Sequence, residues 1–231
     1  MTVPPLVRSA GAELVGSTLL AATVVGSGIA ASRLSPSDAG LQLLENALVT
    51  GAVLVALVVA LGPVSAAFNP VVTLVERALG AVSTRTAAAH VLAQTAGCCL
   101  GVVLADLMYG VDAVGTSRTT RGGAGQLLGE AVATFGLVVV VFGVVRSGRG
   151  SQVGYAVAGW ITAAYWATSS TSFANPAITV ARSLSDTFAG IAPGSVPAFV
   201  LLQLVGGALG LGAVVVLYPE PARLADALVQ R

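Results

Sequence analysis

Six long apolar runs divide the chain, and short polar stretches separate them. The apolar runs cover residues 6–32, 41–61, 86–109, 126–145, 153–168 and 196–217. A helix needs about 20 apolar residues to cross the hydrocarbon core of a bilayer, and most of these runs are close to that length. The pattern predicts an all-α membrane protein with six transmembrane helices.

The composition of the chain agrees with a membrane location. Hydrophobic residues make up 55% of the sequence and charged residues 9%, whereas soluble domains carry about 25% charged residues. The net charge is +1 and there is no lysine, so no basic surface for nucleic acid is indicated. The two cysteines, Cys98 and Cys99, are adjacent and provide neither a disulfide framework nor a metal site. We therefore expect no metal and no cofactor.

Two Asn-Pro pairs follow apolar runs. Asn69-Pro70-Val71 comes after the second run, and Asn175-Pro176-Ala177 comes after the fifth. Asn is a preferred helix N-cap and Pro a preferred first helical residue, so each triplet predicts the start of a short helix. Helix starts at membrane depth are tolerated where they are buried in protein or line a cavity. Two of them predict a pore or binding site.

The two halves of the chain repeat the same polar residues in the same order. Glu13, Asn69 and Gln94 in the first half correspond to Glu130, Asn175 and Gln203 in the second, with offsets of 117, 106 and 109 residues. Three spans per copy force the second copy to enter the membrane from the opposite side. We expect one channel domain over 1–231, with inverted repeats at 1–112 and 125–231 joined by an extracellular loop at 113–124.

The arginine positions predict an orientation. With a cytoplasmic N-terminus, seven arginines lie inside and four lie outside, which satisfies the positive-inside rule. Those inside are Arg8, Arg77, Arg85, Arg146, Arg149, Arg223 and Arg231; those outside are Arg33, Arg118, Arg121 and Arg182. Both termini are then expected in the cytoplasm.

The paired Asn-Pro boxes, with Glu and Gln-x-x-Gly in register, resemble the aquaporins and aquaglyceroporins, the major intrinsic proteins. The resemblance covers nearly the whole chain. It implies a homotetramer in the cell (inner) membrane with one pore per subunit. It also implies that Glu13 and Glu130 accept hydrogen bonds from the loops that carry the short helices. The segment 172–193 is similar to a bacterial branch often linked with arsenic resistance.

The chemistry of the two helix starts can be argued from the residues. A helix start carries about half a positive charge, and the side-chain amide of each Asn can cap its helix and also donate to a passing oxygen. A water between two donors must accept twice, so it leaves the geometry that a proton wire requires, and cations meet a positive field. The arrangement favours passage of neutral molecules.

The resemblance also implies a second constriction, the selectivity filter. In most family members an Arg directly follows the second Asn-Pro-Ala, and here Ile178 stands in that position. The other filter positions fall on Ala163, Ser172 and Thr50, with Val49 as the alternative to Thr50. This ring is small and uncharged, so we expect it to pass glycerol-like polyols, arsenous acid and related metalloid hydroxides, with weaker selectivity for water.

Two departures from the family pattern and one nearby arginine bear on the pore. Val71 replaces the usual Ala and is expected to narrow the pore centre slightly. The segment 62–69 is one residue shorter than usual, which could shift the first short helix. Arg182 lies one turn beyond Ile178, and we expect it to pair with Asp186; reaching back to the filter is the alternative.

Two other classes of function stay open. A secondary transporter also uses inverted repeats and broken helices, and Glu13 and Glu130 are the only candidate ion ligands in its spans. A membrane scaffold with a blocked pore would not conduct at all. An enzyme is not expected, because the sequence contains no Ser/His/Asp set, no metal-ligand spacing and no phosphate-binding loop.

Overall fold

The computed structural model describes residues 3–219, and within them the chain is helical. Arg223 and Arg231, which enter the predicted orientation, lie outside the described residues. The α-helices are α1 (Pro5–Leu34), α2 (Ala39–Leu61), α3 (Pro70–Ala78), α4 (Thr84–Met108), α5 (Ala124–Arg146), α6 (Val153–Ala167), α7 (Pro176–Ala181) and α8 (Val196–Leu217). Short 3-10 turns lie at Gly150–Gln152, Arg182–Leu184 and Pro193–Ser195.

The six apolar runs all form helices, close to the predicted bounds. Five helical stretches of the described chain are long and apolar enough to cross a membrane, namely α1, α2, α4, α5 and the stretch Pro193–Leu217. The fifth run forms α6, which has 15 residues and is preceded by the turn Gly150–Gln152. The prediction of an all-α, multi-pass membrane protein with two additional short helices is confirmed.

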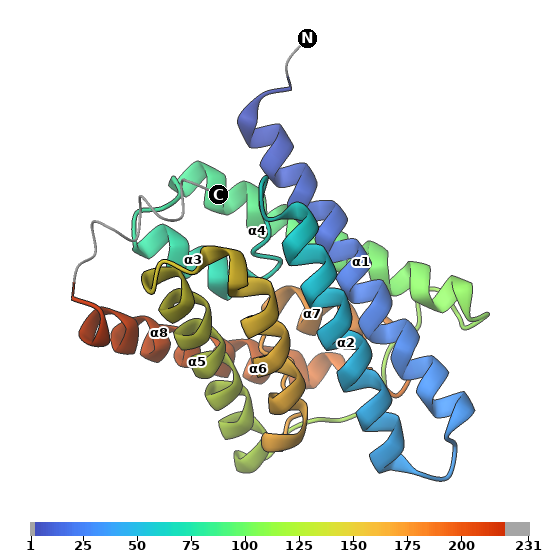
Figure 1. Ribbon diagram of the computed structural model, residues 1–231. Coiled ribbons are helices and arrows are strands. Elements are labelled where there is room, and N and C mark those ends of the chain that lie inside the picture. The colour runs from blue at the N-terminus through green and yellow to red at the C-terminus, as the bar shows by residue number, and fades with distance from the viewer. Residues whose placement is uncertain (1–2, 220–231) are drawn as a thin grey trace.

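The helices pack in two matching sets (Figure 1). In the first half α1 packs along α4 and contacts α2, and in the second half α5 packs along α8 and contacts α6. Helices α2 and α6 pack against each other across the two halves. The short helices α3 and α7 each contact both α4 and α8, so they lie inside the bundle.

Glycines allow the closest helix crossings. A Cβ at Gly97 or Gly101 of α4 would collide with the backbone carbonyls of Leu14 and Thr18 in α1. In the second half, a Cβ at Gly206 of α8 would collide with the backbone of α5. Small residues let helix backbones approach in membranes, where van der Waals packing drives association. Both halves therefore use the glycine after the Gln to join their first and last long helices.

The connecting loop 113–124 is held against the segment that follows α7. The Ser117 N–H donates to the Ser183 carbonyl at 3.0 Å, and the Ala192 N–H donates to the Thr119 carbonyl at 2.7 Å. Arg121 donates from Nε to the Gly190 carbonyl at 2.8 Å. These contacts fix one wall of the molecule next to the end of α7.

Candidate channel site

The short helices α3 and α7 begin at the two predicted asparagines. Asn69 and Asn175 both have extended backbones, with φ of −152°, and Pro70 and Pro176 occupy the first helical positions. The side-chain oxygen of Asn69 accepts from the Val71 N–H at 2.9 Å, and that of Asn175 accepts from the Ala177 N–H at 3.0 Å. Each Asn therefore caps its own helix through its Oδ1 atom.

The two helix starts are joined by a reciprocal pair of hydrogen bonds. Asn69 Nδ2 donates to the Ala174 carbonyl at 2.7 Å, and Asn175 Nδ2 donates to the Phe68 carbonyl at 2.7 Å. Phe68 and Ala174 have φ of 48° and 47°, a left-handed conformation that is uncommon outside glycine. This conformation turns each carbonyl toward the opposite asparagine. Because an amide nitrogen carries two hydrogens, each Nδ2 has a second hydrogen beyond this bond.

Two buried carboxylates hold the loops that precede the short helices. Glu13 accepts from the N–H groups of Ala67 and Phe68 at 2.9 and 2.8 Å and from the Ser65 hydroxyl. Gln94 of α4 donates to the same carboxylate at 2.8 Å and to the Thr73 hydroxyl of α3 at 2.9 Å. The carboxylate thus fixes the loop, and the glutamine links it to the short helix.

The second half repeats the backbone and glutamine hydrogen bonds of this network. Glu130 accepts from the N–H groups of Phe173 and Ala174, both at 2.9 Å. Gln203 donates to Glu130 at 2.5 Å and to the Thr179 hydroxyl at 2.8 Å. Charged acceptors form the stronger hydrogen bonds, so the left-handed backbone before each asparagine is stabilised by the bonds on either side of it.

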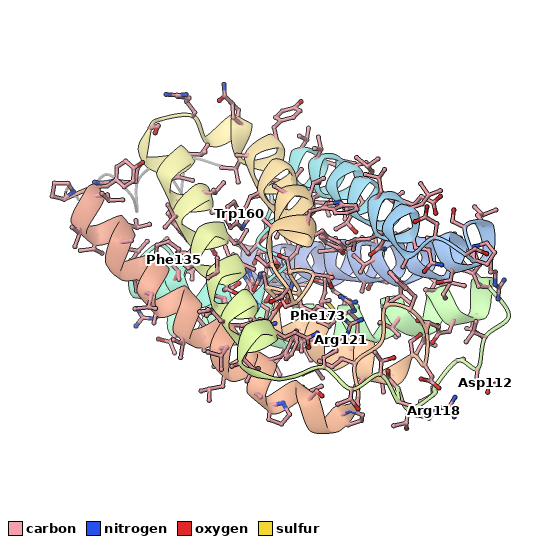
Figure 2. All side chains as sticks on the ribbon, turned by 90° about the horizontal axis from the view of Figure 1, so that it is seen from below. Asp112, Arg118, Arg121, Phe135, Trp160 and Phe173 are labelled. Atoms are coloured by element: carbon pink, nitrogen blue, oxygen red, sulfur yellow. The ribbon has the colours of Figure 1, made fainter. Side chains whose placement is uncertain are left out.

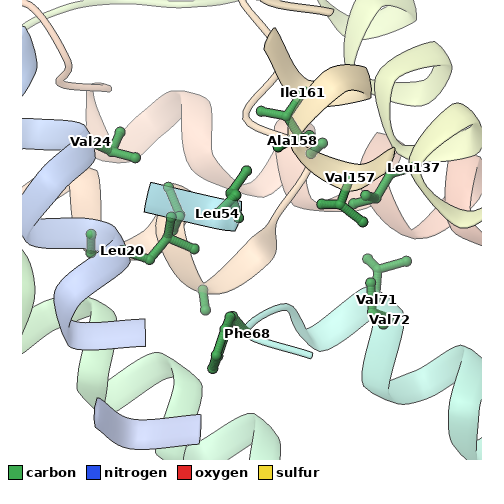
Figure 3. Packing of buried hydrophobic residues seen from close by; sticks show 14 of the residues in the cluster. Leu20, Val24, Leu54, Phe68, Val71, Val72, Leu137, Val157, Ala158 and Ile161 are labelled. Carbon is green, nitrogen blue, oxygen red and sulfur yellow. The ribbon is translucent and has the colours of Figure 1, made fainter. Parts of the chain in front are cut away.

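Both asparagines line one elongated cavity of about 250 Å³. Ser9, Glu76 and His90 line one end, called here the near end, and Tyr165, Ser172 and Arg182 line the opposite end, called the far end. Between them the wall is largely apolar and comes from α1, α2, α5 and α6. Figure 3 shows apolar side chains of this part, including Leu20, Val24, Leu54, Leu137, Val157 and Ile161. A polar pair of donors thus faces a hydrocarbon wall.

Three of the four residues assigned to the filter lie at this cavity. Thr50, Ser172 and Ile178 line it, and each is no more than 6% exposed. The Thr50 hydroxyl is 3.2 Å from the Tyr165 hydroxyl, which links α2 to α6 at the far end. Val49, the alternative to Thr50, is 41% exposed and does not line the cavity.

The assignment of Ala163 is wrong. Ala163 is exposed and lies in a shallow groove between α2 and α6 on the outer surface, next to Thr162 and Trp166. Helix α6 turns Val157, Ile161 and Tyr165 toward the cavity. These residues are four apart and share one helix face. Ala163 is two residues after Ile161, so its side chain is rotated by about 200° around the helix axis and points to the opposite side. The spacing 157, 161, 165 is the signal that identifies the correct positions.

The expected narrowing by Val71 is also wrong. Val71 is 2% exposed and lies against Gly207 of α8, away from the cavity, and the neighbouring Val72 lines the cavity instead. Ala177, the equivalent residue of α7, is likewise buried outside the cavity lining. The shortened segment 62–69 still brings Asn69 into hydrogen-bonding contact with the opposite loop.

Arg182 does not pair with Asp186. The Asp186 carboxylate accepts from the Arg118 backbone N–H at 2.9 Å and from its Nε at 2.7 Å, and these hydrogen bonds hold the pKa of Asp186 below its usual range. An i,i+4 pair needs a continuous helix, but the helix ends at Ala181 and Ser185 is extended, with φ of −127° and ψ of 118°. Arg182 instead lines the cavity.

Comparison with known proteins agrees with this architecture. The model of the major intrinsic protein family matches residues 1–169. Aquaglyceroporin AqpS of Rhizobium meliloti (strain 1021) is 48% identical over 207 residues, which are 89% of this chain and 88% of that protein. The X-ray structure of the aquaglyceroporin from Plasmodium falciparum shares the fold with a TM-score of 0.73 and 20% identity, over 96% of this chain and 99% of that chain.

These findings first define a class, a multi-pass α-helical membrane protein in which two short helices meet at a buried cavity. The family match covers well over half of the chain, and the relative is similar along most of its length. The chain belongs to the major intrinsic protein family.

Proposed function

We propose that the chain is a passive membrane channel for small neutral polyols and hydroxides, with glycerol and arsenous acid as representative solutes and water as a further one. One observation carries the proposal. Asn69 and Asn175 cap opposed helices, are linked through their Nδ2 atoms to each other's loops, and line the same cavity. Membership of the major intrinsic protein family and the similarity to a relative named as an aquaglyceroporin support the proposal.

The geometry suits an uncharged solute that carries hydroxyl groups. The second hydrogen of each asparagine Nδ2 and the positive ends of α3 and α7 favour an oxygen at the centre of the cavity. The opposite wall presents Leu54, Val157 and Ile161, which suit the carbon side of a polyol. A water at the centre accepts from two donors, and its hydrogens then point away from the line that proton transfer would need.

The far end of the cavity supports metalloid hydroxides as solutes. Thr50, Tyr165 and Ser172 provide hydroxyl groups there, and Ile178 provides an apolar side. The Ser172 hydroxyl is buried and has no partner among the described residues, so it is available to a passing solute. Arsenous acid is uncharged at neutral pH and presents hydroxyls as glycerol does. The similarity of segment 172–193 to the branch linked with arsenic resistance supports the same choice.

The secondary-transporter alternative finds no support at the cavity. Glu13 and Glu130 are fully buried, are engaged by loop N–H groups and glutamine side chains, and do not line the cavity. A carboxylate that would bind a coupling ion must reach the solute path. The two acids serve instead to hold the loops that carry α3 and α7.

The proposal extends to the arrangement in the membrane. We place 1–112 and 125–231 as inverted repeats, and the matching Glu–Gln–Thr networks of the two halves support this division. The arginine distribution supports cytoplasmic termini, and 113–124 is then extracellular; the family resemblance supports a location in the inner membrane. The family resemblance supports a homotetramer with one pore in each subunit.

Flux into liposomes that contain the purified protein tests the proposed function. Glycerol entry is followed by stopped-flow swelling, and arsenite entry is followed by arsenic determination in washed vesicles. We expect both solutes to enter faster than in protein-free liposomes, without saturation in the millimolar range and without dependence on an ion gradient. Water flux with neither solute would contradict the proposal, and gradient-dependent, saturable uptake would favour a transporter.

A further inference from the structure

Arg182 stands two turns beyond Asn175, at the far end of the cavity. It belongs to the 3-10 turn Arg182–Leu184 that continues α7. Its side chain is 4% exposed and lines the cavity together with Ser172 and Ile178. The family position for an arginine, directly after the Asn-Pro-Ala box, holds Ile178 in this chain. The structure therefore places a guanidinium at the cavity although that position carries none.

Two contacts hold the guanidinium of Arg182. Its Nε donates to the Ala189 carbonyl, and its Cζ lies 3.4 Å from the centroid of the Phe173 ring. Phe173 is itself fixed, because its N–H donates to Glu130 and its ring packs edge-on against Phe199 at 5.4 Å. A guanidinium stacks well on an aromatic face. The residue cannot swing out of the cavity without losing both contacts.

A brace from α4 supports the segment that binds Arg182. The buried Asp106 carboxylate accepts from the Ser185 hydroxyl at 2.8 Å. The oxygen of the same Ser185 hydroxyl lies 3.0 Å from that of the Thr187 hydroxyl. This segment leads directly to Ala189, the acceptor for Arg182 Nε. The carbonyl that orients Arg182 is therefore anchored to a long helix.

The guanidinium of Arg182 is not in ion-pair contact with an acid. Among residues 3–219, no carboxylate lies within ion-pair distance of its guanidinium. A second guanidinium, that of Arg121, lies 5.0 Å from the centroid of the same Phe173 ring. Figure 2 shows Arg121 and Phe173 together in the interior, whereas Arg118 lies at the edge of the molecule. Arg121 donates to backbone carbonyls, and the buried Glu130 is the acid that acts on both guanidiniums from beyond ion-pair distance, so the far end carries two positive charges for one nearby carboxylate.

We propose that Arg182 is the specificity-determining charge of the channel: it excludes cations at the far end and donates hydrogen bonds to neutral solutes there. In this position it takes over a role for which Ile178 is unsuited. A guanidinium has five N–H donors, and Ala189 occupies one of them, so others can serve a hydroxyl oxygen. Repulsion of a cation is strong in a cavity of low dielectric constant. The inference rests on the proposed channel function.

Cation leak and glycerol entry, measured in the same liposomes, test the inference. Arg182→Gln and Arg182→Met both remove the charge; the flexible Met side chain can also pack on the Phe173 ring. Under a clamped potassium diffusion potential, either folded variant should raise proton or sodium entry about tenfold, the change that a barrier lower by about 1.4 kcal/mol produces. Glycerol entry should fall by no more than about twofold, because the hydrogen bonds from the guanidinium are lost while the central donors at the two asparagines remain.

Two controls separate the charge from its surroundings. Arg118→Gln removes an exposed arginine from the same side of the molecule, outside the cavity lining, and should leave the cation leak unchanged. Arg182→Lys keeps the charge and should retain most of the cation exclusion. The inference would be overturned if Arg182→Gln and Arg182→Met matched the unaltered protein in thermal stability but showed no extra cation leak. It would also be overturned if Arg182→Lys leaked cations as fast as Arg182→Gln. Absence of glycerol entry in the unaltered protein would instead refute the proposed function.

Discussion

At the scale of single residues, each asparagine performs several tasks with different atoms. The Oδ1 of Asn175 caps α7, and its Nδ2 donates to the Phe68 carbonyl. The remaining Nδ2 hydrogen is then oriented by two bonds rather than by the side-chain torsions alone. An oriented donor loses less entropy when a solute binds. Such an oriented donor can form a hydrogen bond to a solute oxygen at a small entropic cost.

Replacement of Ile178 tests the far-end ring at the same scale. Ile178→Arg should lower glycerol and arsenite entry by roughly tenfold, because a second long, charged side chain beside Arg182 narrows the ring and adds a barrier of about 1.4 kcal/mol. Stopped-flow swelling and arsenic uptake measure the effect, and Ile178→Val serves as the control of unchanged polarity. Entry equal to that of the unaltered protein would mean that Ile178 does not border the solute path.

The sequence predicts the capping residues better than the cavity lining. Asn69 and Asn175 were identified because capping depends on the next two or three residues alone. The sequence misplaces three residues, Ala163, Val71 and Arg182, because the direction of each side chain depends on tertiary geometry. Thr171, Ser172 and Ala174 all have positive φ, so counting back through that loop does not carry helical phase from α7 to α6.

At the scale of elements, the hydrophobic runs set the helix bounds, and glycines at the helix crossings set how closely two helices approach. Helix α4 approaches α1 so closely that Gly101 faces the Thr18 carbonyl and the Ala21 side chain. Gln94, on the same helix, then reaches both Glu13 and Thr73. Close packing of α1 and α4 is therefore what allows the carboxylate to reach the loop before α3.

A matched pair of glycine variants tests this packing. Gly101→Val should lower the stability by about 1–3 kcal/mol, because the added methyl groups overlap the backbone of α1, and solute entry should fall with it. Gly11→Val, in α1, is the control, since a Cβ there meets nothing within 4 Å. Thermal unfolding in detergent should show a lower Tm for Gly101→Val alone. Equal Tm values for the two variants would contradict the role given to Gly101.

At the scale of the whole molecule, the two halves reproduce one design with local differences. The Glu–Gln–Thr networks match, and each loop donates one carbonyl to the asparagine of the other half. The ends of the short helices differ, since the position of Arg182, directly after α7, corresponds to Glu76 in α3, seven residues past each asparagine. Polar residues in the same order, at offsets of 117, 106 and 109 residues, indicated matching halves from the sequence, whereas the chemistry of the two cavity ends was not predictable.

A matched tryptophan pair on α6 tests most directly whether solutes pass through the cavity at the two asparagines. Ile161 faces this cavity and Ala163, two residues later, faces the outer groove. After normalisation to folded, reconstituted protein, Ile161→Trp should reduce glycerol entry more than about tenfold, because the indole fills the passage, while Ala163→Trp should retain most of it. Equal entry through both variants, or loss with Ala163→Trp alone, would contradict the account.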